Sequence, residues 1–67
     1  MTAAAQTTLR AALEAVQRCE RAEDELFQRV PSSGPDLPLA LLEMARLKRA
    51  TANALTIAYS VAIDVLS

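Results

Sequence analysis

The sequence predicts an all-α fold, an antiparallel hairpin of two long helices, and three observations support this prediction. Of the 67 residues, 14 are Ala and 10 are Leu, whereas Phe27 and Tyr59 are the only aromatic residues, a composition that favours helices over strands. All three prolines and the single glycine lie within residues 31–38, so only this segment breaks the helical pattern. The two flanking segments are nearly equal in length, and a short connection between such helices returns the chain antiparallel. We expect residues 1–67 to form one domain.

The first helix is expected to span about residues 3–29. Apolar residues recur there at spacings of three and four, which places them on one side of a helix. Glu23 interrupts this stripe, and Lys48 interrupts a stripe of the second helix, so the two are candidate partners across the hairpin. The stripe consists of Leu9, Ala12, Leu13, Val16, Cys19, Leu26, Phe27 and Val30.

The turn is expected over residues 30–37 and the second helix over about residues 38–66. Asp36 or Leu37 is predicted near the N-cap, with Pro38 in the first turn. Backbone N–H groups of the first turn have no acceptor within the helix, so the lack of an N–H in proline costs no hydrogen bond there. A narrow polar stripe runs along this helix and leaves more than half of its circumference apolar. The polar residues are Arg46, Arg49, Asn53, Thr56, Ser60 and Asp64.

The second helix carries two adjoining apolar faces, and the first helix can cover only one of them. Bulky side chains fill a seam best, so we expect the face with the larger residues to pack against the first helix. The predicted hairpin core is therefore Leu9, Leu13, Val16, Phe27, Leu41, Leu55, Tyr59, Ala62 and Leu66, with Ala45 and Ala52 on the same face. The predicted partner-binding face is Leu47, Ala50, Ala54, Ile57, Ala58, Val61 and Val65. If the two faces are reversed, Ala58→Glu will unfold the chain and Leu55→Ala will spare the fold.

The uncovered face predicts an interaction surface, because soluble monomers rarely expose a large apolar patch. A lone hairpin of this length also buries little apolar area against the entropy cost of ordering the chain. We therefore expect a partner, or self-association into a helical bundle, to complete the hairpin. The alanines of the second helix would allow close contact between helices.

Several other functions are not expected. The sequence contains no histidine, so Cys19 cannot form the usual Cys/His nucleophilic pair, and we predict no enzymatic activity, no metal site and no cofactor. A sequence pI near 5.2 argues against nucleic acid despite the basic cluster at residues 46–49. Residues 50–66 are short for a membrane span and include Asp64. Met1–Thr8 lacks the features of a secretory signal, which predicts a cytoplasmic protein.

These features resemble the small cytoplasmic co-chaperones of type III secretion needle subunits, the YscE-like group. The similarity involves the stripe of Leu9, Leu13 and Val16, then Cys19, the turn that ends at Pro38, and the alanine-rich run over residues 45–62. The resemblance implies a helical hairpin that binds a larger helical-repeat chaperone, the pair together holding the aggregation-prone needle subunit before export.

Two alternatives remain open. The turn from Pro31 to Pro35, followed by Leu41 and Leu42, is also similar to the turn of the needle subunits themselves, which are helical hairpins. Alternatively, the chain forms a homodimeric four-helix bundle, as small regulatory hairpins do, in which the uncovered apolar face meets its symmetry mate.

Overall fold

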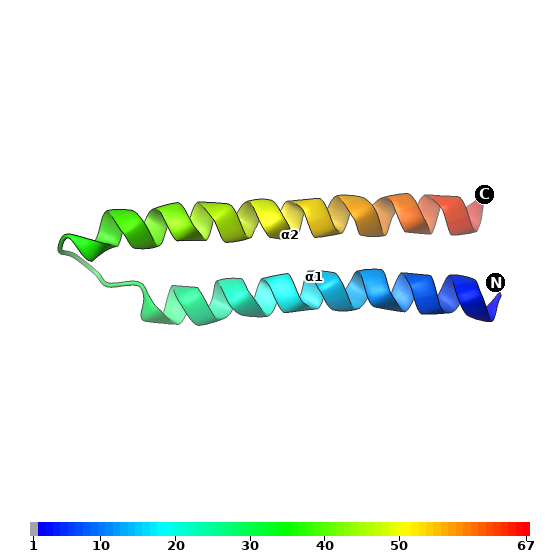
Figure 1. Ribbon diagram of the computed structural model, residues 1–67, viewed down its shortest axis with the longest axis horizontal. Helices are drawn as coiled ribbons and strands as arrows, with labels where there is room; N and C mark the ends of the chain where they lie inside the picture. Colours follow the sequence, from blue (N-terminus) through cyan, green and yellow to red (C-terminus); the bar gives the residue numbers. More distant parts are fainter. Residues whose placement is uncertain (1) are drawn as a thin grey trace.

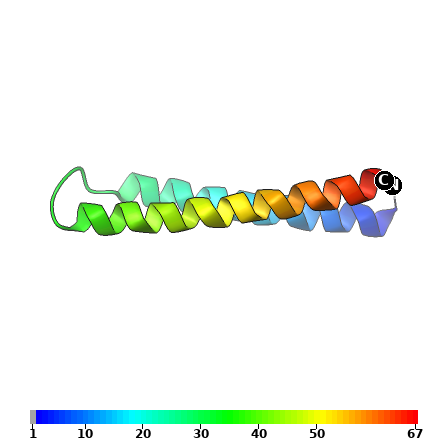
Figure 2. The same ribbon diagram turned by 90° about the horizontal axis from the view of Figure 1, so that it is seen from above.

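The protein is a two-helix hairpin, as predicted. The computed structural model describes residues 2–67, with helix α1 over Ala3–Arg29 and helix α2 over Asp36–Leu66. The helices run side by side in opposite directions, so the start of α1 and the end of α2 lie together (Figure 1). Viewed from above, they cross at a small angle (Figure 2). The Cα atoms extend 52 Å along the helices but only 15 and 10 Å across them, so every residue lies near the surface.

Helix α1 begins and ends where local chemistry dictates. The Thr2 hydroxyl accepts a hydrogen bond of 3.1 Å from the Ala5 N–H, which satisfies one of the free donors of the first turn. At the other end, Val30 adopts an extended conformation with φ −66° and ψ 124°. Pro31 favours that geometry in the residue before it and cannot continue the helical hydrogen bonding.

Helix α2 begins at Asp36, two residues before the predicted start. Pro35 is the N-cap residue rather than Asp36 or Leu37, and its helical φ of −68° suits the entry. Pro38 falls in the first turn, where backbone N–H groups have no helical acceptor, so the helix can begin ahead of it. Gly34 makes the bend before the helix with φ +97°, a conformation that favours glycine.

The contact between the helices has the spacing of an antiparallel coiled coil. Buried and half-buried residues alternate at intervals of three and four along both helices, which is the heptad pattern of coiled-coil packing. On α1 and the residue after it they are Ala5, Leu9, Ala12, Val16, Cys19, Glu23, Leu26 and Val30. On α2 they are Leu37, Ala40, Met44, Leu47, Thr51, Ala54, Ala58, Val61 and Val65. We call these seventeen residues the seam; Ala15, Ala22, Pro31 and Ala62 are half-buried at its edges.

The predicted hairpin core is wrong at six of its nine positions. Val16 is buried as predicted, and Leu9 and Ala62 are half-buried. The six residues that the structure leaves exposed are Leu13, Phe27, Leu41, Leu55, Tyr59 and Leu66. The assumption that bulky residues fill the hairpin contact therefore does not hold for α2.

Charge and side-chain size account for the observed seam. The nine seam positions of α2, from Leu37 to Val65, include no charged residue. The face that was expected to pack against α1 includes Lys48. Packing that face against α1 would bury the ammonium group of Lys48, which is costly even when it is paired. Ala54 and Ala58 in the observed seam also let the two backbones approach closely.

Candidate interaction surface

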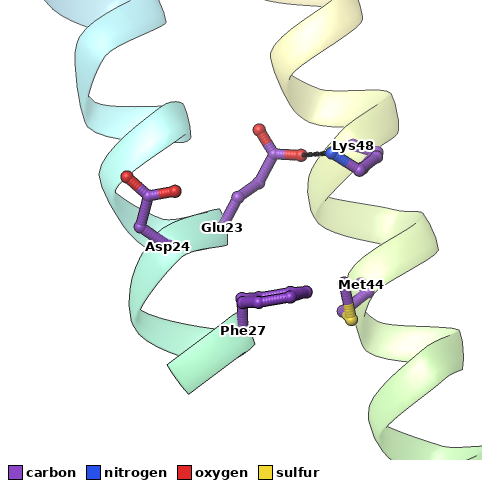
Figure 3. A pocket seen from close by; sticks show the side chains of 5 residues that line it. All are labelled: Glu23, Asp24, Phe27, Met44 and Lys48. Carbon is purple, nitrogen blue, oxygen red and sulfur yellow. Dashed lines mark ion pairs between the residues drawn. The ribbon is translucent and has the colours of Figure 1, made fainter. Parts of the chain in front are cut away.

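A polar contact fixes the register of the seam at its middle. The Thr51 hydroxyl donates a hydrogen bond of 2.8 Å to the Glu23 carboxylate and also lies 3.1 Å from the Leu47 carbonyl oxygen. The Lys48 ammonium group lies 3.0 Å from the other Glu23 carboxylate oxygen (Figure 3). The predicted pairing of Glu23 with Lys48 is thus confirmed. A polar residue at a seam position specifies register, since only one alignment satisfies its hydrogen bonds.

The environment of Glu23 favours its charged form. The hydrogen bond from Lys48 and then the hydrogen bond from Thr51 lower the pKa of the Glu23 carboxyl below its ordinary value, against a smaller opposing effect of burial. The Glu23 side chain is 17% exposed, whereas Lys48 is 71% exposed. The ammonium group therefore keeps most of its contact with water while the carboxylate lies inside the seam.

Phe27 lies on the same edge of the seam as Lys48. A shallow pocket is lined by Glu23, Asp24 and Phe27 from α1 and by Met44 and Lys48 from α2. In Figure 3 the ring of Phe27 extends toward α2 beneath the Glu23–Lys48 pair. Phe27 is 69% exposed, so α2 covers little of it.

A second, mostly apolar stripe runs along α2 beside the seam, and the rest of the described chain leaves most of it exposed. Its positions repeat at intervals of three and four, so it has the same heptad spacing as the seam, about a quarter turn around the helix. We call it the outer stripe, and it comprises Leu41, Ala45, Lys48, Ala52, Leu55, Tyr59, Ala62 and Leu66. Leu41 is 53% exposed, Tyr59 is 66% exposed and Leu66 is 85% exposed.

Two residues of α1 extend this surface. Phe27 lies beside Lys48 of the outer stripe, and Leu13 precedes Phe27 by two heptads, which places it on the same side of α1. Both side chains are exposed. We call the outer stripe together with Leu13 and Phe27 the outer face; it includes all six exposed residues that were expected in the core.

The predicted partner-binding face also needs correction. Ala50 and Ile57 are exposed, and Ile57 adjoins the polar stripe at Asn53 and Ser60. The other five residues of that prediction belong to the seam: Leu47, Ala54, Ala58, Val61 and Val65. The signal in the sequence that distinguishes the two faces is Lys48, because a seam without a charge was available one position away.

The chemistry of the described residues is limited. Residues 2–67 contain no cluster of three or more potential metal-ligating side chains. Within the same range, neither helix combines the length and hydropathy needed to cross a membrane. The chain matches no family model, no curated protein and no solved structure.

Proposed function

We propose that this protein is a non-enzymatic interaction module that docks a helical surface on its outer face. The observation that carries the proposal is the outer stripe, a complete second heptad pattern that its own hairpin leaves uncovered. Single exposed apolar residues are common, but a row of mostly apolar side chains along one helix is typical of a binding site.

The spacing of the outer stripe specifies the shape of its partner. Positions that repeat every three and four residues fit the ridges and grooves of another α-helix. Ala45, Ala52 and Ala62 leave gaps between the large side chains, into which side chains of a facing helix can insert. The partner surface is therefore an amphipathic helix or a helical bundle.

A more specific proposal is that the module acts as a cytoplasmic co-chaperone in type III protein secretion. The resemblance to YscE-like co-chaperones supports it, as does an uncovered apolar face on a chain of this size. In that role, the outer face would pack on a helical-repeat chaperone, and the two proteins would together hold a needle subunit before export.

Coexpression tests this proposal. The chain is coexpressed with the needle subunit and the helical-repeat chaperone of its host, and the soluble complex is isolated and its stoichiometry measured. We expect Tyr59→Glu to abolish the complex and Ile57→Glu to leave it intact, because both residues are about equally exposed but only Tyr59 lies on the outer face. Equal binding by both variants would contradict the outer face as the docking site.

A further inference from the structure

We propose that, in the absence of another partner, the outer face is covered by a second copy of this chain, with the two α2 helices antiparallel about a two-fold axis between Asn53 and Ala54. The resulting dimer is a four-helix bundle. This inference rests on the proposed function in one respect, namely that the outer face is a docking surface. It adds that the molecule docked there is a second copy of the chain.

The outer stripe is self-complementary in this arrangement. A two-fold axis at this point pairs all eight stripe positions with none left over, whereas a shift by one heptad leaves positions at the ends unpaired. The pairs between copies are Leu41 with Leu66, Ala45 with Ala62, Lys48 with Tyr59, and Ala52 with Leu55.

The position of Lys48 favours the antiparallel direction. In a parallel pair, Lys48 would face Lys48 of the second copy, and like charges in a contact are unfavourable. In the antiparallel pair, Lys48 faces the aromatic ring of Tyr59, the only aromatic residue of α2, which attracts a cation. Lys48 also keeps its ion pair with Glu23 within its own hairpin.

The second copy would also approach the exposed apolar residues of α1. Phe27 lies beside Lys48 of the outer stripe, and Leu13 lies on the same side of α1 two heptads earlier. A helix packed on the outer stripe therefore comes near both side chains.

The geometry and the area both suit a four-helix bundle. The seam and the outer stripe lie about a quarter turn apart on α2, so a helix on each stripe makes α2 one corner of a square bundle. Covering the exposed parts of the large α2 side chains in both copies would bury on the order of 1,000 Å², the lower end of the range for a specific interface.

The mass of the purified protein in solution tests whether a second copy of the chain covers the outer face. We expect sedimentation equilibrium of the purified full chain to give twice the monomer mass at micromolar concentration. Tyr59→Glu should raise the dimer dissociation constant on the order of a hundredfold, because the substitution enters the interface twice, whereas Ile57→Glu should leave it unchanged. A monomeric wild-type chain would overturn the proposal.

Cysteine pairing tests the register without disturbing the fold. In a Cys19→Ser background, chains with Ala45→Cys are mixed with chains with Ala62→Cys under mild oxidation. We expect disulfides between the two kinds of chain and few when Ala45→Cys is mixed with Ala52→Cys. Efficient bonding of Ala45→Cys to itself would indicate a parallel dimer and overturn the arrangement.

The outcomes also separate this inference from the proposed function. A monomeric wild-type chain that binds a helical partner through Tyr59 would refute the second copy and keep the docking surface. A dimer that survives Tyr59→Glu, together with partner binding that survives it, would refute both.

Discussion

Thr51 is the only buried polar residue in the described chain. Its hydroxyl group contacts the carboxylate of Glu23 from the opposite helix and so links the two halves of the hairpin. Hydrogen bonds to charged groups are stronger than neutral ones. An apolar residue at position 51 would leave the half-buried carboxylate with one partner fewer.

Thr51→Val tests this contact with almost no change in shape. We expect the free energy of unfolding to fall by about 1 kcal/mol, because the lost charge-assisted hydrogen bond outweighs the gain of an apolar methyl group. Thr56→Val is the matched control, since the Thr56 hydroxyl also bonds the carbonyl four residues earlier but reaches no carboxylate. Chemical denaturation measures both; equal effects would refute a special role for Thr51.

The lowered pKa of Glu23 predicts an acid-sensitive contribution to stability. A carboxyl group whose pKa is lower in the folded state stabilises the fold above its unfolded pKa of about 4.3, and this contribution is lost as pH falls through the folded pKa. The wild type should therefore be more stable than Glu23→Gln at pH 7, and the difference should shrink below about pH 4. Thermal unfolding of both proteins across this range makes the comparison. A difference that is constant with pH would contradict it.

Helix α2 is the element on which both stability and the proposed binding depend, because it has two heptad stripes and only one other helix in the hairpin to pack against. The seam stripe contains the smaller residues and holds α1, whereas the outer stripe contains Leu41, Tyr59 and Leu66 and remains open. Substitutions on one helix should therefore divide into two classes according to the stripe on which they fall.

Ala58→Glu and Leu55→Ala separate these classes. Ala58 lies half-buried in the seam, one heptad from Thr51, so a charge there should abolish most helicity in circular dichroism. Leu55 lies on the outer stripe, so its truncation should cost the hairpin less than about 1 kcal/mol yet weaken association. This is the pattern expected if the two faces predicted from the sequence are reversed. Loss of association by a folded Ala58→Glu variant would restore the original assignment.

The turn between the helices predicts one further effect. Gly34 has φ +97°, and an added methyl group would meet no atom within 4 Å, so any cost of Gly34→Ala comes from the backbone alone. We expect a loss of about 1 kcal/mol in unfolding free energy. Ser33→Ala, in the same exposed turn, is the control and should change little. Denaturant titration distinguishes them, and equal stability of Gly34→Ala and wild type would exclude strain at this position.

The whole molecule is too thin to bury a core. Val16 and Leu26 are the only apolar residues of the described chain that are buried, and a single layer of two helices cannot bury many more. Its stability is therefore expected to depend on association, as in other small chains that form part of a larger assembly.

Thermal unfolding provides the measurement for this dependence. If folding is coupled to dimer formation, the Tm of the wild type should rise with protein concentration, because association stabilises the folded state by mass action. The Tm of Tyr59→Glu should be lower and independent of concentration, whereas Ile57→Glu should behave as wild type. A wild-type Tm that does not vary over a hundredfold range of concentration would show that the isolated hairpin is stable alone.

The sequence by itself determined the two helices, the turn between them and the pairing of Glu23 with Lys48. These features depend on local chemistry, namely the prolines and glycine of residues 31–38 and two charges that each interrupt an apolar stripe. Only the tertiary structure decided which stripe of α2 packs against α1. Both stripes have the same heptad spacing, so periodicity could not distinguish them. The choice depends on Glu23, which needs a hydrogen-bond donor inside the seam and a cation at its edge, and only the alignment that buries Thr51 and leaves Lys48 in water provides both.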